Sequence, residues 1–299
     1  MHNHSHNHTH DHQDIKNIKT AFFLNFGFTI LEFVGGFYVN SVAIISDAIH
    51  DLGDSLSLLS SWYFQKLSHK GRTHSFSYGY KRFSVLSAII NSMVLLGGSV
   101  FILIETIPRI ISPEQPDTHG MILLSILGII VNGAAVLKTR KGKSMNERVV
   151  SLHLLEDVLG WITVLIGSIV MTFYDIPIID PILSILIAAY ILFNVFKNLF
   201  ASFKIILQGT PSDLDLNSIK ERLMSIPAVK NIHDLHTWSM DGDYHVLTVH
   251  LVLHKEKDFS QRTQIKQDAR ALLEKEAIEH ATIELELEGE CDTSVDRHD

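Results

Sequence analysis

Two long apolar segments of the sequence each carry a histidine followed four residues later by an aspartate. His50 and Asp54 lie in the second apolar segment, and His153 and Asp157 have the same order and spacing in the fifth. On a helix, residues four apart project from the same face. Two such helices offer two imidazoles and two carboxylates, a ligand set that can close the tetrahedral site that zinc prefers. The spacing therefore predicts a metal site inside the apolar region, in preference to two unrelated polar pairs between helices.

The predicted ligands also suit an exchange of metal for protons. Imidazole and carboxylate bind zinc only when they are deprotonated, so metal binding releases protons and protonation releases metal. Histidine suits this exchange because the ordinary pKa of its side chain, about 6.5, lies within the pH range that cells maintain. An aspartate at the centre of a membrane helix costs about 2.5 to 3.5 kcal/mol on insertion scales, so the aspartates require a partner.

Three further carboxylates lie in the first two apolar segments. Asp47 lies on nearly the same helical face as His50 and Asp54, and we expect it to support the ligands or to lie on the path of the ion. Asp51 is turned by about 100° from His50, which favours a structural role. Glu32 is a lone carboxylate that is either protonated and structural or exposed to the ion path. The remaining polar residues of these segments are interpreted as interhelical hydrogen-bonding groups: Asn25, Asn91, Glu105 and Asn132.

The elements that must position these residues are membrane helices. The chain has 299 residues, of which 46% are hydrophobic, and its mean hydropathy of +0.19 arises from clustered apolar stretches. Each stretch is long enough to cross a hydrocarbon core that requires about 20 residues. We therefore expect six transmembrane helices, at residues 16–39, 42–65, 83–111, 118–140, 148–174 and 180–207.

The distribution of charge predicts how the chain is oriented. Lysine and arginine precede the first segment and fill the loops after the second and fourth, whereas the other three connections carry neither. By the positive-inside rule, both termini are expected in the cytoplasm. The first residues lack the features of a signal peptide. The single cysteine, Cys291, excludes an intramolecular disulfide framework and a CxxC zinc ribbon, and no global basic patch points to nucleic acid.

Four regions are expected along the chain. Residues 1–14 form a disordered tail that captures metal, unless it is a tolerated low-complexity segment or a tag. Residues 15–208 form the six-helix transmembrane domain, residues 209–290 a soluble domain and residues 291–299 a C-terminal tail. The order helix, strand, strand, helix, strand after Gly209 predicts a small α+β domain with its helices on one face of the sheet. The histidines of the N-terminal tail are His2, His4, His6, His8, His10 and His12.

Metal-binding side chains are also frequent in the expected soluble domain. They can assemble one or more further metal sites, although exposed strand histidines are common without metal. Apolar and polar residues alternate from residue 246 to residue 254, which gives the predicted sheet one apolar and one polar face. The candidate ligands are His233, His236, His245, His250, His254, Glu284 and Glu286.

From about Ile15 to Glu288 the sequence resembles the cation diffusion facilitators. The matching features are the SDAIHDLGDS and HLLEDVLGW segments, six spans, a histidine-bearing terminus and a C-terminal domain containing HDLHTWS and TIELE. The resemblance implies a homodimer that exports zinc and related divalent ions in exchange for protons. It also implies that the intramembrane zinc site maps onto His50, Asp54, His153 and Asp157.

The resemblance implies a second zinc site in a metallochaperone-like cytoplasmic domain, at the dimer interface. That site maps onto His233, His250 and Glu286, with Glu284 where some members have histidine. The loop after the second span departs from the family pattern. It reads THSFSYGYKR, in which His74 is kept but Tyr78 replaces a ligand, so with His69 nearby only a weak loop site is expected. Just after GY-x-R, where members of the family often have an acidic residue, this sequence has Ser84.

These features together predict a transporter rather than an enzyme. It would export Zn²⁺, with Cd²⁺ and Co²⁺ as further candidate ions, from the cytoplasm in exchange for protons by alternating access. An intramembrane metalloenzyme is one alternative, but the H-E-x-x-H motif of zinc hydrolases is absent. A membrane metal sensor is another, and it leaves the acidic second and fifth segments unexplained. Zinc is expected as substrate and as regulatory ligand, and the short loops favour a bacterial inner membrane.

Overall fold

The computed structural model describes residues 23, 26–68, 71–139 and 145–290. Side chains of residues 138–139 and 145–153, and of several positions between 58 and 68, lie outside the description as well. The described chain divides into two compact units. The helical unit contains the described residues up to Tyr63 and Ala88–Asn198. The sheet unit contains the described residues of Phe64–Ser87 and those from Leu199 onward.

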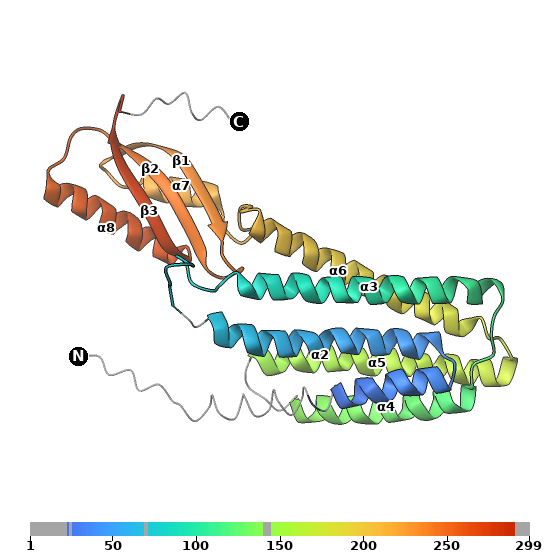
Figure 1. The fold of residues 1–299 in the computed structure, drawn as a ribbon. Helices are drawn as coiled ribbons and strands as arrows, with labels where there is room; N and C mark the ends of the chain where they lie inside the picture. The colour runs from blue at the N-terminus through green and yellow to red at the C-terminus, as the bar shows by residue number, and fades with distance from the viewer. Residues whose placement is uncertain (1–22, 24–25, 69–70, 140–144, 291–299) are drawn as a thin grey trace. The chain divides into compact units, whose positions relative to one another are not determined.

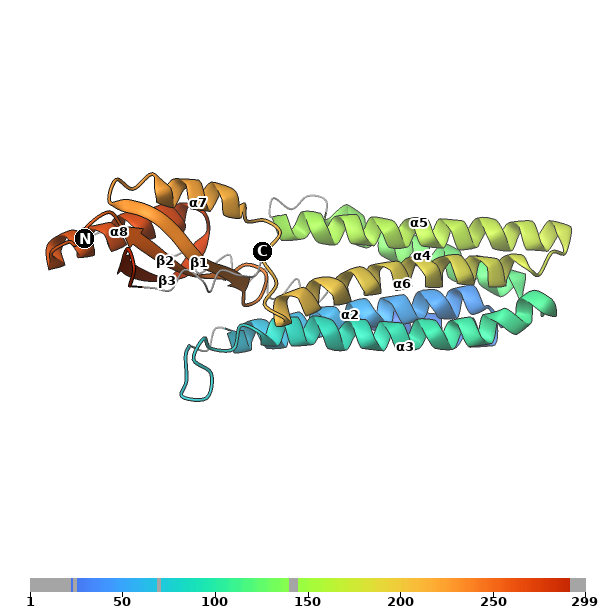
Figure 2. The ribbon, with the colours of Figure 1, turned by 90° about the horizontal axis from the view of Figure 1, so that it is seen from above.

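Long helices follow one another through the apolar part of the chain (Figures 1 and 2). Each one begins and ends within a few residues of a predicted apolar segment, except the first, which is described without a break only from Phe26. The predicted segments are therefore helical wherever the structure describes them. The bounds are Phe26–Tyr38 for the first helix, α2 Val42–Ser68, α3 Phe83–Ile111, α4 Thr118–Thr139, α5 Met145–Tyr174 and α6 Ile179–Ile206.

Four stretches of the described chain are both long and apolar enough to cross a membrane, one each in α3, α4, α5 and α6. For these four segments, a helix with the length and apolar composition of a membrane span is confirmed. The helix α2 does not reach the same hydropathy because His50 and three aspartates interrupt its apolar sequence. The described part of the first helix, Phe26–Tyr38, is too short to span a bilayer. Membrane crossing by the first two segments therefore stays a prediction.

The helical unit packs around the indole ring of Trp161 in α5. Trp161 is completely buried and lies in one apolar cluster with Phe28, Ile44 and Met121, which come from the first helix, α2 and α4. Its ring meets that of Phe28 edge-on, with 5.9 Å between the ring centroids. Large apolar side chains elsewhere on these helices, such as Phe193, are exposed as expected for a surface that faces lipid.

The sheet unit has the predicted order of elements: α7 (Leu216–Met224), β1 (Val229–Ser239), β2 (His245–Leu253), α8 (Phe259–Lys275) and β3 (Ile278–Leu287). The strand β2 is central, antiparallel to β1 and parallel to β3. Asp215 caps the first turn of α7, and Asp258 with Gln261 forms a capping box at the start of α8. These side chains bind backbone N–H groups that have no partner within the helix, which fixes where each helix begins.

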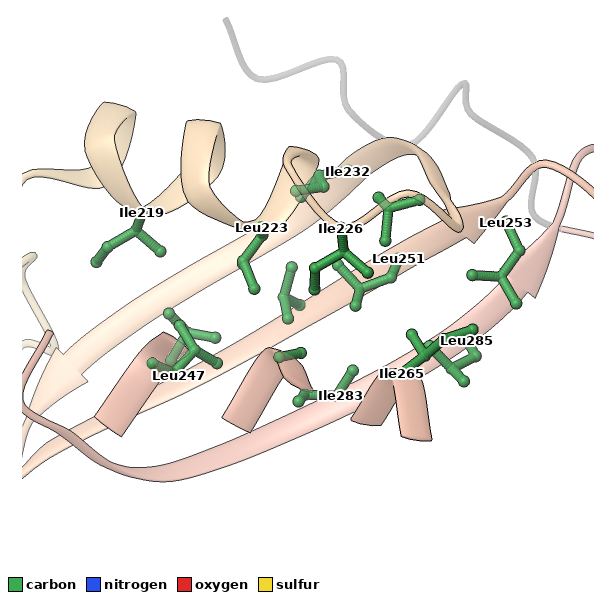
Figure 3. Packing of buried hydrophobic residues seen from close by; sticks show 14 of the residues in the cluster. Ile219, Leu223, Ile226, Ile232, Leu247, Leu251, Leu253, Ile265, Ile283 and Leu285 are labelled. Atoms are coloured by element: carbon green, nitrogen blue, oxygen red, sulfur yellow. The ribbon is translucent and has the colours of Figure 1, made fainter. Parts of the chain in front are cut away.

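One cluster of buried apolar residues joins α7 and α8 to the sheet (Figure 3). Ile219 of α7 and Ile265 of α8 lie in this cluster together with Leu247 and Leu251 of β2. The predicted apolar face of β2 is confirmed, because Leu247, Val249, Leu251 and Leu253 all lie in this cluster. The other face is mixed: Thr248 and His250 are half-buried, whereas Val246 and Val252 are buried outside the cluster. The side chains on the other face of the sheet, His250 among them, are therefore left for other contacts.

Candidate functional site

A cavity of about 230 Å³ in the helical unit is lined by residues of α2, α5 and α6. Asp47 and His50 line it from α2, and Asp157 lines it from α5. Asp47 and Asp157 are only 7% and 6% exposed. Apolar side chains form most of the remaining wall: Val164, Leu183, Leu186 and Ile187. A few polar groups thus converge in an otherwise apolar cavity, which is the usual character of a small-ligand site.

His50 and Asp54 lie on one face of α2, as the four-residue spacing predicts. Nε2 of His50 lies 3.6 Å from Oδ2 of Asp54. Asp54 is not among the residues that line the cavity, and lies one turn further along the helix. His153 belongs to α5, one turn before Asp157, but its side chain lies outside the described residues. The structure therefore brings together Asp47, His50 and Asp157 and leaves the complete set of four ligands as a prediction.

The donor set fits a divalent cation of intermediate hardness. Imidazole nitrogen and carboxylate oxygen are both ligands of zinc, and neither requires a thiol. These groups bind metal in their deprotonated forms, so a change of protonation at the cavity wall can load or release the ion. The cavity can thus exchange a metal ion for protons without any covalent chemistry.

Two more carboxylates are buried close to this cavity. Glu32, from the first helix, and Asp51, from α2, are 0% and 2% exposed. Glu32 lies near the side chains of Asp51 and Trp161 and within electrostatic range of Asp47 and Asp157. Four neighbouring carboxylates in an apolar setting require compensating positive charge, either protons or a metal ion.

The sequence reasoning missed two residues of the cavity wall, Glu156 and Tyr190. The hydroxyl of Tyr190 donates a hydrogen bond to Oε2 of Glu156 at 3.4 Å, and its ring lies 6.5 Å from the ring of His50. Glu156 immediately precedes Asp157, so its acidic character in an apolar segment was a usable signal. Tyr190, in the sixth apolar segment, gives no such signal in the sequence, because its proximity to His50 depends on how α2 and α6 pack.

A second cluster of metal-binding side chains lies in the sheet unit. Oε2 of Glu286 lies 2.9 Å from Nε2 of His233, and Oε1 lies 2.6 Å from Nδ1 of His250. Within the described residues this is the one group of three whose ligand atoms all lie within 4.8 Å of one another. The pairing of β1 with β2 places His233 opposite His250. The parallel pairing of β2 with β3 places Glu284 beside His250 and Glu286 beside Val252, two residues further along, from where the Glu286 carboxylate reaches both histidines. These distances are short enough for a single ion to be bound by all three groups.

The other candidates of the sheet unit lie at varying distances from this cluster. Glu284 approaches Nε2 of His250 at 3.5 Å but is 63% exposed. His236 is 65% exposed and lies 2.7 Å from Asp234, whose second oxygen lies 3.4 Å from His250. Asp234 was not predicted, although it directly follows His233 in the sequence. Asp234 reaches His236 and His250 because β1 is irregular there, with a φ of 52° at Asp234.

His245 belongs to neither cluster. It is buried and its Nε2 lies 3.1 Å from Oδ2 of Asp213, so it attaches the segment before α7 to the sheet. His245 therefore does not contribute to this cluster, and it lies five residues before His250 on β2. His254 follows β2 and is exposed.

The remaining candidates belong to the first tail and to the loop after α2. The tail histidines from His2 to His12 and the loop residue His69 lie outside the described residues. His74 is described and exposed, and it belongs to no group of three metal-binding side chains within the described part of the chain. The weak loop site thus stays a prediction.

Comparison with known proteins covers both units of the chain. Residues 18–207 match the family model of the cation efflux transmembrane domain, and residues 211–288 match that of the cytoplasmic domain of cation efflux proteins. A cadmium, cobalt and zinc/H(+)-K(+) antiporter of Bacillus subtilis is 33% identical over 294 residues, which cover 96% of this chain and 92% of the relative. The zinc transporter ZitB of Escherichia coli is 31% identical, over 96% of this chain and 92% of the relative. The metal cation efflux system protein CzcD of Cupriavidus metallidurans is also 31% identical, over 91% and 86%.

Proposed function

The chain belongs to the cation efflux family, and from this premise we propose that it exports Zn²⁺ from the cytoplasm in exchange for protons. It is a multi-pass membrane transporter and not an enzyme. Similarity to an antiporter of cadmium, cobalt and zinc and to a zinc transporter supports Zn²⁺ as the main substrate and Cd²⁺ and Co²⁺ as further ions.

One observation carries the proposal: Asp47 and His50 of α2 line the same cavity as Asp157 of α5. We assign the transported ion to His50, Asp54, His153 and Asp157, which offer two nitrogens and two oxygens to a tetrahedral metal. Because the ligands come from two helices, a relative movement of these helices can expose the ion to one side of the membrane and then to the other. The metal ion is the substrate of this site and leaves in every cycle.

Protons supply the driving force in this scheme. Moving a divalent ion outward against an inside-negative potential costs about 4.6 kcal/mol per 100 mV, at about 2.3 kcal/mol for each charge. Protonation of the ligands on the outer side releases the metal, and deprotonation on the inner side prepares the ligands again. Exchange of one proton or of two is compatible with the ligand set.

The buried carboxylates near the cavity support this exchange. Glu32 and Asp51 interact with each other, and both lie near Asp47. We assign them to holding protons or orienting the metal-binding residues while the ion is bound, and Asp47 to the path by which the ion reaches His50. Removing one of these groups is expected to change the coupling of metal to protons more than the identity of the transported metal.

The sheet unit supplies a regulatory zinc site in this proposal, at His233, His250 and Glu286, with Glu284 and His236 at its edge. We further propose that the chain acts as a homodimer with both termini in the cytoplasm of a bacterial cell. The division into residues 1–14, 15–208, 209–290 and 291–299 assigns metal capture to the first tail, transport to the helical region and regulation to the α+β domain.

Zinc accumulation in inside-out membrane vesicles tests the proposal. A transporter produces saturable uptake that depends on an acidic vesicle interior and is lost in Asp157→Ala, whereas Asp117→Ala, at the start of α4, serves as an aspartate control outside the cavity. A metal sensor would bind zinc without uptake. An intramembrane hydrolase would consume a substrate without moving metal.

A further inference from the structure

The first turn of α2 is held by a carboxylate from α6. Oδ1 of Asp180 accepts a hydrogen bond from the Ser41 hydroxyl at 2.5 Å and from the Ala43 amide at 3.3 Å. Oδ2 accepts one from the Val42 amide at 2.8 Å. Asp180 is 2% exposed, and the three donors belong to residues that are completely buried. We call this set of hydrogen bonds the α2 anchor.

The anchor completes the hydrogen bonding of the helix start. The first N–H groups of an α-helix have no carbonyl partner within the helix and must find other acceptors. Ser41 acts as the cap, since its hydroxyl oxygen accepts a hydrogen bond from the Ile44 amide at 3.2 Å while it donates to Asp180. Asp180 binds the two preceding N–H groups, and a negative group is favoured at a helix N-terminus. The hydrocarbon core of a membrane contains no water that could replace these hydrogen bonds, so their loss would be costly.

The same two helices meet again at the metal-binding cavity. His50 follows Ser41 by nine residues, and Tyr190 follows Asp180 by ten, so both lie about 14 Å along their helices from the anchor. The rings of His50 and Tyr190 are 6.5 Å apart. The helices α2 and α6 therefore run in the same direction from the anchor and together form part of the cavity wall.

A third helix holds the turn that precedes α2. Nη1 of Arg109, in α3, donates a hydrogen bond to the backbone oxygen of Asn40 at 3.1 Å. Asn40 has a φ of 53°, and its side-chain amide donates to Glu114 at 3.0 Å. This end of α2 is thus tied to α3 and α6 by hydrogen bonds.

We propose that Asp180 is a positioning residue that keeps the start of α2 fixed on α6 throughout transport, so that α2 moves about this point when the site changes its access. The inference rests on the proposed function. A fixed anchor transmits the movement to His50 and Asp54 while leaving their affinity for metal unchanged. The opposite arrangement is a gate, in which the anchor breaks in each cycle to release the ion.

Two measurements on the full-length protein in proteoliposomes test the proposal. Asp180→Asn keeps the size of the side chain but replaces one acceptor oxygen by an N–H₂ group. We expect the maximal rate of zinc transport to fall at least tenfold, while the KM for zinc and the zinc affinity at equilibrium change less than twofold. The matched control is Asp175→Asn, since Asp175 lies five residues earlier and bonds Gln115 instead of α2. An unchanged rate in Asp180→Asn, or a loss of affinity equal to the loss of rate, would overturn the proposal.

The second measurement distinguishes an anchor from a gate. In a Cys291→Ser background, Ser41→Cys places a thiol at a completely buried position. We expect its modification by a membrane-impermeant thiol reagent to be equally slow with and without zinc and a proton gradient. A tenfold faster modification during transport would show that the anchor opens, which overturns the proposal. Absence of zinc flux in the wild type would overturn the proposed function rather than the anchor. Slow, gradient-independent labelling of this thiol would still report a closed anchor.

Discussion

Gly128 in α4 lies directly against the indole ring of Trp161 in α5. A Cβ atom at residue 128 would come within 2.3 Å of Cδ2 of Trp161 and within 2.5 Å of Cε2. Trp161 is completely buried and lies near Glu32, one of the carboxylates close to the metal-binding cavity. The absence of a side chain at Gly128 therefore permits the close packing of α4 on α5, which in turn sets the position of the helix that carries Asp157.

Gly128→Ala is expected to destabilise the helical unit. The new methyl group cannot fit without moving the indole ring, and such overpacking typically costs about 1 to 3 kcal/mol. Gly133→Ala is the matched control, because it lies in the same helix and a Cβ there meets nothing within 4 Å. We expect a lower thermal unfolding temperature in detergent for Gly128→Ala and an equal or higher one for Gly133→Ala, since alanine favours helix by about 0.5 to 1 kcal/mol over glycine. Equal stability of the two variants would show that α4 and α5 do not pack as described.

His50→Asp is expected to alter metal selectivity. Replacing an imidazole by a carboxylate makes the site harder, which favours the oxygen-seeking Mn²⁺ over Zn²⁺. We expect Cd²⁺ to gain as well, because of its larger size and not because of hardness. Competition between zinc and cadmium for transport in vesicles measures the change, with His254→Asp as a control on an exposed histidine of the sheet unit. An unaltered ratio of zinc to cadmium transport in His50→Asp would remove His50 from the ligand set.

His233→Ala is expected to remove one bound zinc ion per chain without abolishing transport. The ligand atoms of His233, His250 and Glu286 are mutually within 4.8 Å, and loss of one imidazole leaves too few protein ligands for tight binding. The stoichiometry of zinc bound at equilibrium, measured by calorimetry on protein lacking residues 2–12, reports the loss. His254→Ala is the control and should leave the stoichiometry unchanged. Complete loss of transport in a folded His233→Ala variant would place this cluster on the transport path instead.

Removal of residues 2–12 is expected to raise the apparent KM for zinc more than it lowers the maximal rate. A tail with six histidines raises the local concentration of metal but supplies no ligand to the cavity. Zinc uptake measured over a range of concentrations separates the two effects. Replacement of the six histidines by asparagine is the matched control for length, and abolished transport in either variant would contradict the capture role.

The sequence was sufficient for predictions that depend on local pattern. The repeated H-x-x-x-D spacing placed His50 and Asp54 on one helical face, and the alternation in β2 identified the four residues of this strand that lie in the core cluster. Helix bounds were also predicted closely because turns and charged residues interrupt the apolar segments. These patterns reflect the helical and strand periods, which a single sequence displays directly.

Relationships between distant segments could not be obtained in this way. The carboxyl group of Asp180 was not singled out, because its partners at residues 41 to 43 lie about 140 residues earlier and most of them are backbone amides. Asp234 reaches His236 and His250 only because β1 departs from regular strand geometry there. His245 shares its residue type with the other candidates, and its contact with Asp213 and its position on β2 separate it from them.

Zinc-driven proton movement in proteoliposomes tests the central claim most directly. Purified wild-type protein and Asp157→Ala would be reconstituted with a pH-sensitive dye inside, and zinc would be added outside at equal pH and zero membrane potential. The account predicts a saturable, zinc-dependent change of internal pH in the wild type and none in Asp157→Ala. Proton movement that persists in Asp157→Ala would show that metal and protons are exchanged at a site other than the cavity lined by α2, α5 and α6.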